Sequence, residues 1–366
     1  MYKQYLKISL LTFSFLMLIV ASVNFIIDPG EIYLKKILAD SKSKEFSSKL
    51  FLSENGIIQS GWNERLIKTT LAKSAGDFDC IILGSSHMMQ ISSVRNTGKI
   101  NSNCDGLLNL GVSGGGLEDI SIFSYFIINN LKLPKKIFIG VDPFTFNFKI
   151  DARYGAHMAP YNKMNDLLGL LEAGENVSYL SKLAKNLFNG KYFYSSILAL
   201  SDENIINKND LFEQEIYYPN ESFSYENGYS QPLTLKDGSH LYAQPWIENQ
   251  RTLIVPRGGG GHLMADNVYN PNSVSYLKKL IDLYRSKNID VHLIMTPYHP
   301  NVFKKGETKP VIHMRIVEEM ITSFSDRHYI KYYGSFFPDK IGCLNDEFFD
   351  FMHATNECLG RIDFSQ

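Results

Sequence analysis

The sequence has almost no net charge, no internal repeat and no low-complexity tract. Its 37 lysine and arginine residues nearly balance 38 aspartate and glutamate residues, which leaves a formal net charge of −1 at pH 7. Nucleic-acid-binding domains carry a basic patch or stripe, and nothing in this balance indicates one. Hydrophobic residues make up 44% of the chain and charged residues 20%, which is typical of a globular protein. We therefore expect a globular protein with no nucleic-acid partner.

Cysteine is also scarce, with four in the chain. Cys80 and Cys104 each lie near the start of a candidate strand, and Cys343 and Cys358 flank "LNDEFFDFMHATNE". In an exported protein these residues could form two disulfides, and four unpaired, partly buried thiols are the alternative. The paired C-x-x-C spacing of zinc sites is missing, which argues against a metal ion held by Cys343, His353 and Cys358.

One long hydrophobic run lies near the N-terminus. Residues 8–27, "ISLLTFSFLMLIVASVNFII", carry no charge, and at about 1.5 Å per residue they are long enough to cross a bilayer. A cleaved signal peptide is the alternative, but its apolar region is usually about 7 to 15 residues long, and "VASVNF" is a poor cleavage site. Lys3 and Lys7 precede the run, which predicts a cytoplasmic N-terminus and an exported remainder, although Lys35 and Lys36 follow it.

Short apolar strands alternate with helical patterns along much of the remaining chain. The predicted strands cover residues 80–84, 106–112, 135–143, 290–297 and 328–334. The predicted helices cover residues 86–95, 117–131, 272–288 and 311–325, with a last short helix near Ala354. Such alternation predicts an α/β fold with a mainly parallel sheet that is covered on both faces.

The alternation is interrupted at about residues 150–270. Within this stretch, residues 162–200 look helical, and residues 210–262 are rich in Tyr, Asn, Gly and Pro and look like loops. We predict an N-terminal membrane anchor over residues 1–28 and one domain over residues 29–366 that carries this stretch as a large insertion.

A serine follows the first predicted strand, in "FDCIILGSSHMMQIS" (78–92). Ligands of open α/β sheets bind beyond the carboxyl ends of the strands, where Gly84 to His87 lie. The helix start that follows would point free N–H groups and a positive dipole at the same place. A serine there has an accessible hydroxyl and an oxyanion donor in its own N–H. The alternative is a serine that merely caps the helix.

Further polar groups follow the other strands. The second strand ends in "NLGVSGGG" (109–116), the third in "GVDP" with Asp142, and "DFMH" places Asp350 three residues before His353. A carboxylate at that spacing can hold the imidazole ring and fix its tautomer. With a serine at the first strand end, this pair predicts a nucleophile, a base and a group that orients the base.

This combination resembles the SGNH superfamily, also called GDSL-type hydrolases, over residues 78–146 and 290–358. "GSSH" places Ser86 at the nucleophile position, "NLGVSGG" places Gly114 where an oxyanion N–H donor is expected beside that of Ser86, and "DFMH" matches the Asp-x-x-His block. The anchor, "GVDPF" and "TPYHP" are similar to the membrane-anchored branch with alginate-type O-acetyltransferases and the D-alanyl transfer protein. The resemblance implies a three-layer α/β/α, flavodoxin-like fold.

The sequence departs from the family at two positions. Ser85 stands where the superfamily usually has an aspartate, and Asp142 stands where it usually has an asparagine that donates to the oxyanion. An ionised carboxylate cannot donate a hydrogen bond. Asp142 is therefore expected to be neutral, to hold loop N–H groups, or to mark a changed reaction.

Several other residues are candidates to line the site. His87 follows the nucleophile, and Tyr298 and His299 lie at the end of the fourth strand. A capping or structural-turn role is the alternative for each of them. Asp142 is a further candidate to line the site, because it lies at the end of the third strand.

The resemblance implies an extracytoplasmic serine acyltransferase, anchored once in the cytoplasmic membrane with its domain facing the periplasm or cell exterior. It would O-acetylate or otherwise acylate a cell-envelope polysaccharide through acyl-Ser86, with a polytopic membrane acyltransferase as acyl donor and no cofactor. An esterase that releases the acyl group to water and a non-catalytic envelope scaffold are the alternatives. A nucleotide-binding enzyme is a further alternative because "GVSGGG" joins a strand to a helix, but G-x-G-x-x-G is absent.

Overall fold

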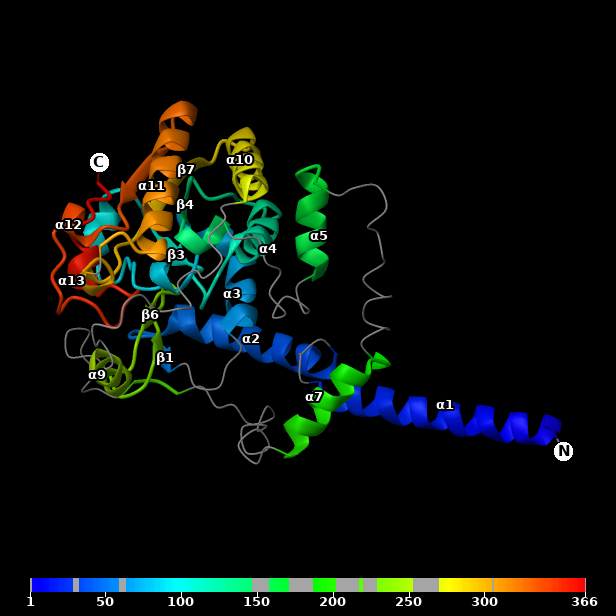
Figure 1. Ribbon diagram of the computed structural model, residues 1–366. Helices are drawn as coiled ribbons and strands as arrows, with labels where there is room; N and C mark the ends of the chain where they lie inside the picture. The colour runs from blue at the N-terminus through cyan, green and yellow to red at the C-terminus, as the bar shows by residue number, and fades with distance from the viewer. Residues whose placement is uncertain are drawn as a thin grey trace. The chain divides into compact units, whose positions relative to one another are not determined.

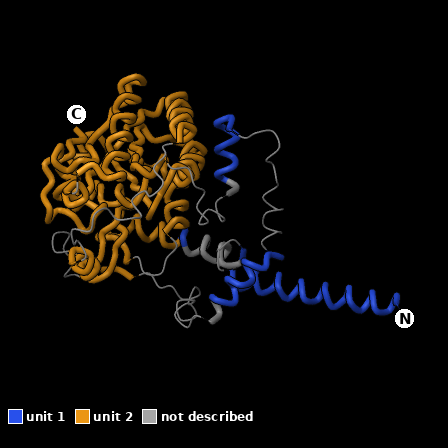
Figure 2. Tube along the Cα trace, in the orientation of Figure 1, with its two compact units in different colours: residues 1–44, 151–215 blue, residues 45–150, 216–366 orange. Residues whose placement is uncertain are grey.

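The computed structural model divides the chain into two compact units, residues 1–44 with 151–215 and residues 45–150 with 216–366 (Figure 2). It describes residues 2–28, 33–58, 64–146, 158–170, 187–201, 217–219, 229–252, 270–304 and 306–365. The first unit holds the helices α1 (Tyr2–Ile27), α5 (Met158–Leu167) and α7 (Gly190–Ser201). The helix α2 (Leu34–Leu52) begins in the first unit and ends in the second. The expected insertion is thus shared between the two units.

The second unit is built on a parallel sheet of five strands. They are β2 (Cys80–Leu83), β3 (Leu107–Asn109), β4 (Lys136–Gly140), β7 (Asp290–Met295) and β8 (Lys331–Gly334). Their order is β3-β2-β4-β7-β8, with every neighbouring pair parallel. Each lies where the sequence predicts a strand, so the expectation of a mixed α/β fold with a parallel sheet is confirmed.

Long helices connect the strands (Figure 1). They are α4 (Leu117–Ile128), α10 (Pro271–Ser286) and α11 (Lys309–His328). Each follows one strand and precedes the next one in the same direction across the sheet, so the usual right-handed crossover puts all three on one face. Hydrogen bonds from the Tyr276 and Tyr284 hydroxyls to Ser121 and Ser124 join α10 to α4. The short helix α3 (Glu64–Ala72) is joined to α4 by an ion pair between Arg65 and Asp119.

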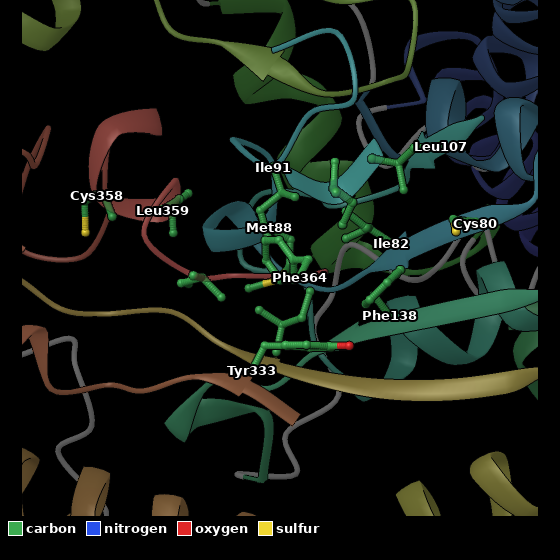
Figure 3. Packing of buried hydrophobic residues seen from close by; sticks show 14 of the residues in the cluster. Cys80, Ile82, Met88, Ile91, Leu107, Phe138, Tyr333, Cys358, Leu359 and Phe364 are labelled. Atoms are coloured by element: carbon green, nitrogen blue, oxygen red, sulfur yellow. The ribbon is translucent and has the colours of Figure 1, made fainter. Parts of the chain in front are cut away.

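The other face of the sheet is covered by turns and by the C-terminal segment. Ile82, Phe138 and Tyr333 of the strands gather there with Met88 and Phe364 (Figure 3). The covering elements are η2 (Ser86–Met88), η3 (Thr97–Ser102), α12 (Pro338–Ile341) and α13 (Asn356–Leu359). Further single turns are η1 (Ala75–Asp77), η4 (Pro143–Phe146) and η6 (Pro300–Val302).

The prediction of a helix over residues 86–95 is wrong, because one 3-10 turn and irregular turns replace it. The Asn109 side-chain amide donates to the carbonyls of Met88 and Ile91, both at 2.8 Å. The Met88 carbonyl also accepts from Ile91 N at 3.0 Å, which is the spacing of a tight turn and not of an α-helix. The Asn109 side chain thus ties this turn to the neighbouring strand. Close packing also fixes the turn, since a Cβ at Gly84 or Gly140 would lie within 2.6 Å of the Met88 side chain.

A small antiparallel sheet occupies part of the stretch that was expected to be loops. It consists of β1 (Ile57–Ile58), β5 (Leu233–Thr234) and β6 (His240–Leu241), and the helix α9 (Gln244–Thr252) follows it. Its hairpin turn is bound to the main sheet, because the Asp237 carbonyl accepts from Asn109 N at 2.7 Å and His240 N donates to the Met89 carbonyl at 2.8 Å. The hairpin is therefore held beside the segment that carries Ser86.

In the first unit, α1 is the helix with the composition of a membrane span. Its mean hydropathy is 2.4 over its most apolar window, and 6% of that window is buried. Large apolar side chains along it are exposed, among them Leu10, Phe13 and Leu18. Length and composition alone therefore allow α1 to cross a bilayer, as the sequence predicts.

Candidate active site

Ser86 lies just beyond the carboxyl end of β2, as the first residue of η2. Ser85 caps this turn, because its Oγ accepts from His87 N at 3.1 Å. The Ser86 side chain lies at the surface of the core, with the residue 8% exposed. The capping role is thus filled by the preceding serine, and the Ser86 hydroxyl is available for other contacts.

His353 and Asp350 form a tight local unit in the C-terminal segment. Asp350 Oδ1 accepts from the backbone N–H groups of Met352 at 2.7 Å and His353 at 2.8 Å. Its Oδ2 lies 2.8 Å from His353 Nδ1. Burial raises the pKa of this carboxyl group, but the hydrogen bonds from His353 and Met352 outweigh burial and lower the pKa to about 2. The three-residue spacing of "DFMH" therefore places an ionised carboxylate behind the ring.

The third contact joins this unit to the serine. His353 Nε2 lies 2.8 Å from Ser86 Oγ, across 267 residues of sequence. Because the carboxylate holds a proton on Nδ1, Nε2 is left with a lone pair that can accept the Ser86 hydroxyl proton. The proximity of Ser86, His353 and Asp350 that the sequence predicts is present in the structure.

Two disulfides enclose these residues. Cys80 and Cys104 are joined with their Cα atoms 5.6 Å apart, and Cys343 and Cys358 with theirs 5.1 Å apart. All four belong to the core beneath the sheet. The sequence left paired and unpaired cysteines open, and the structure has both pairs. The sulfur atoms of Cys343 and Cys358 are therefore not available to bind a metal ion together with His353.

The glycine-rich turn after β3 lies against the serine turn. Val112 N donates to the Gly84 carbonyl at 3.1 Å, and a Cβ on Gly115 would lie 2.6 Å from the same oxygen. Gly114 has φ +58, a left-handed conformation that favours glycine. Within the part of the chain that the structure describes, neither Ser86 N nor Gly114 N donates a hydrogen bond. Neither N–H group is therefore engaged by another described residue.

Asp142 is fully buried beside this turn. Its Oδ2 accepts from Ser85 Oγ at 2.6 Å, and its Oδ1 lies 3.5 Å from His87 Nδ1. The structure thus places the two residues that depart from the family pattern in contact with each other. The Asp142 side chain therefore accepts from the Ser85 hydroxyl group. One expectation from the sequence was that it would hold loop N–H groups instead.

His87 packs behind the proposed base. Its ring centroid lies 5.1 Å from that of His353 and 5.1 Å from that of Tyr298, and its Nδ1 is 3.2 Å from Thr296 Oγ1. Burial lowers the pKa of His87, although Asp142 acts in the opposite direction. Burial likewise raises the pKa of Tyr298 well above its ordinary value. Both residues therefore adjoin the site in their neutral forms.

His299 braces the segment that carries the base. Its Nδ1 accepts from Asn301 N at 2.9 Å, and its backbone N–H donates to the Phe351 carbonyl at 3.1 Å. Its ring packs against Phe348, with centroids 5.2 Å apart. The contacts described for His299 are those of a structural turn, the alternative role considered for it.

Sequence reasoning missed Tyr242 and the cavity beside it. The Tyr242 ring stacks on Trp246 at 4.7 Å and lies 5.9 Å from the His353 ring, between centroids. It lines a cavity of about 410 Å³ together with the segment after β2, α9 and the C-terminal segment, which contribute Arg95, Arg251, Phe349 and Glu357 among others. The aromatic residues of the insertion, such as Tyr229 and Trp246, were a signal for a glycan-binding surface, but packing of the insertion was the favoured explanation for them.

No family model matches the sequence, and no curated protein matches it either.

Proposed function

We propose that this chain is a membrane-anchored serine acyltransferase of the SGNH type that acylates a cell-envelope polysaccharide outside the cytoplasm. The observation that carries the proposal is the hydrogen-bonded series from Ser86 through His353 to Asp350, with 2.8 Å at each step. A serine, a histidine and a carboxylate in this arrangement recur in acyl transfer on unrelated folds. The series lies beyond the carboxyl end of a parallel strand, where open α/β sheets bind their ligands.

The strand order supports the SGNH part of the proposal. Numbered by position along the chain, the five parallel strands run 2-1-3-4-5, which is the order of flavodoxin-like sheets. A three-layer α/β/α arrangement of that type would have helices on both faces. In this chain short turns and α13 cover the second face in place of longer helices.

The proposed chemistry begins with Ser86. His353 Nε2 takes the hydroxyl proton as Ser86 Oγ attacks the acyl carbonyl carbon of a donor, and Asp350 stabilises the imidazolium ion. The tetrahedral intermediate collapses, the donor leaving group departs with the proton from His353, and acyl-Ser86 remains. A sugar hydroxyl then gives its proton to His353 and attacks the same carbon. The bond from that carbon to Ser86 Oγ breaks, His353 returns the proton to Oγ, and the acylated sugar and the free serine remain.

The N–H groups of Ser86 and Gly114 are the proposed oxyanion donors. One donor of this kind contributes about 3 to 4 kcal/mol to transition-state stabilisation in other enzymes. Asp142 accepts a hydrogen bond from Ser85, so we assign it to holding the serine turn in place and not to the oxyanion.

Transfer is favoured over hydrolysis by two features. The cavity of about 410 Å³ next to Tyr242 can hold an acceptor one side chain away from His353. The apolar helix α1 would keep the protein beside a membrane-bound donor, for which the family resemblance suggests a polytopic acyltransferase.

Two disulfides suit the periplasm or the cell exterior, because disulfides persist in oxidising compartments.

The test is the Ser86→Ala variant of the full chain in the native cell. We expect the acyl content of the envelope polysaccharide to fall to background, since loss of the nucleophile lowers acyl transfer by about 10⁴-fold or more. A serine-directed phosphonate should label the wild-type protein at Ser86, by mass spectrometry of peptides, and should not label the variant. Ser102→Ala, at an exposed serine, is the matched control for both measurements.

Other outcomes would favour the alternatives. Labelling at Ser86 with rising polysaccharide acylation in the variant would indicate an esterase that removes acyl groups. Absence of labelling in the wild-type protein, together with a phenotype that Ser86→Ala does not alter, would indicate a non-catalytic scaffold.

A further inference from the structure

The helix α7 is bound to the last turn of α1 by polar contacts. Asn24 Nδ2 donates to the Leu187 carbonyl at 2.8 Å, and Ser196 Oγ donates to Asn24 Oδ1 at 3.0 Å. The Tyr192 hydroxyl donates to Asp28 Oδ1 at 2.8 Å. Asn24 and Ser196 are completely buried by this packing. The start of α7 and the end of α1 are therefore fixed to each other within one unit.

These contacts set the depth of α7 if α1 spans a bilayer. The uncharged run of residues 8–27 is about 30 Å long as a helix, which matches the hydrocarbon core of a bilayer. Asn24 lies three residues before the end of α1, so it would be about 4 to 5 Å inside the edge of that core. A polar side chain at this depth needs a partner, and Ser196 of α7 and the carbonyl of Leu187, three residues before the helix, are its partners.

Part of the outer side of α7 is apolar and exposed, beside the exposed Lys191 and Ser195. Tyr194 is 65% exposed and Ile197 is 42% exposed, and Phe188, just before the helix, is 48% exposed. Tyr194 and Ile197 are three residues apart and so lie on the same side of the helix. In water such a surface would be unfavourable, but aromatic and aliphatic side chains at the boundary of a bilayer are favourable. This surface belongs to the same unit as α1, whose last turn also exposes Phe25 and Ile26.

From this arrangement we infer that α7 is a second membrane-contacting element, which lies in the boundary between lipid headgroups and acyl chains with Tyr194 and Ile197 against the lipid. The occupant of its apolar side is the bilayer itself. The inference rests on the proposed role of α1 as an anchor. It means that the chain contacts the membrane at α1 and again within the insertion between β4 and α10.

Tryptophan probes in the full chain test the inference. The chain is reconstituted into phosphatidylcholine–phosphatidylglycerol vesicles, with Trp62 and Trp246 replaced by phenylalanine. Single probes are then introduced by Leu18→Trp in α1 and Tyr194→Trp in α7, with Leu131→Trp at a fully exposed position of the other unit as the control. Brominated lipids quench only tryptophans that contact acyl chains. We expect strong quenching at positions 18 and 194 and none at position 131.

Each result bears on one part of the inference. Quenching at position 18 without quenching at position 194 would overturn the role of α7 and leave the anchor standing; it would fit a protein partner, which the vesicles lack. No quenching at either position would overturn the anchor and the inference together. Ile197→Trp, on the same side of α7, provides a second probe if Tyr194→Trp loses the circular dichroism of the folded chain.

Discussion

Lys68 is a buried lysine in the middle of α3, with 2% of its surface exposed. Its ammonium group donates to the backbone carbonyls of Asn109, at 2.9 Å, and Gly238. Burial lowers the pKa of Lys68 from 10.5 to about 8. This side chain thus connects α3, the end of β3 and the turn of the hairpin that carries Tyr242, and it does so at an electrostatic cost.

The first prediction concerns the pH dependence of stability. Between the folded pKa of about 8 and the ordinary value of 10.5, the unfolded chain binds the Lys68 proton and the folded chain does not. The contribution of Lys68 to the free energy of unfolding therefore rises with pH across this range, by up to about 1.4 kcal/mol per pH unit. Denaturant unfolding in detergent should show a slope that Lys68→Met removes. Lys309→Met, at an exposed lysine, should keep it; an equal slope in both variants would contradict the prediction.

The second prediction concerns Asp350. The Asp350→Asn side chain can still accept from the backbone N–H groups of Met352 and His353, but it no longer holds the charge that fixes the proton on His353 Nδ1. We expect the rate of hydrolysis of a small artificial ester to fall by about 10³- to 10⁴-fold, as in other triads. The protein should still unfold cooperatively. A rate within tenfold of the wild-type rate would argue against Asp350 as the orienting group.

At this scale, the contact between the three candidate residues was predictable, but their surroundings were not. We could identify Ser86, Asp350 and His353 because two patterns can be recognised in the linear sequence. These are a serine after a buried strand and an Asp-x-x-His spacing. Asn109 and Tyr242 carry no such pattern. Asn109 acts through carbonyls of a different segment, and Tyr242 reaches His353 only because the insertion folds back.

Among the elements, the two disulfide-closed loops carry the proposed catalytic residues. The sequence separations are 24 for Cys80–Cys104 and 15 for Cys343–Cys358. The chain-entropy model gives about 3 to 3.5 kcal/mol of stabilisation for loops of these lengths. The first loop contains Ser86, and the second contains Asp350 and His353.

The third prediction follows from the shorter loop. Replacing Cys343 and Cys358 together by serine should lower the free energy of unfolding by about 3 kcal/mol, as measured by denaturant titration in detergent. Ester hydrolysis should fall as well, since the segment that holds Asp350 loses a constraint. The matched double replacement at Cys80 and Cys104 gives the comparison for the other loop. A change below about 1 kcal/mol would show that packing alone holds the C-terminal segment.

Periodicity explains which elements could be predicted. The strands β2, β3, β4 and β7 are mostly apolar and buried, whereas β8 exposes Lys331 and Tyr332. The helices α4, α10 and α11 have helical spacing, and each of these elements appeared within a few residues of its expected place. The turn after β2 shares that spacing at Met88 and Ile91, but its backbone bonds join residues three apart, as in a 3-10 turn. The Asn109 side chain then ties its carbonyls to the next strand. The strands of the small sheet have two residues each, which is too short for any period to be visible.

On the scale of the whole molecule, the role of α1 gives the fourth prediction. A protein released by deleting residues 1–27 behind a cleavable signal peptide should still hydrolyse a small ester, because the proposed triad lies wholly in the other unit. Acylation of the native polysaccharide in cells should fall sharply, since the anchor raises the effective concentration of the domain near a membrane-bound donor. Equal acylation by the released and anchored proteins would show that the tether is dispensable.

The disulfides also have a consequence for timing. Each encloses one partner of the Ser86–His353 contact, and neither would persist in a reducing cytoplasm. If the domain is exported as proposed, a newly made chain that is still in the cytoplasm would therefore lack both braces of the proposed site. Oxidation after export would then complete that site, and the proposed acyl transfer would begin only outside the cytoplasm.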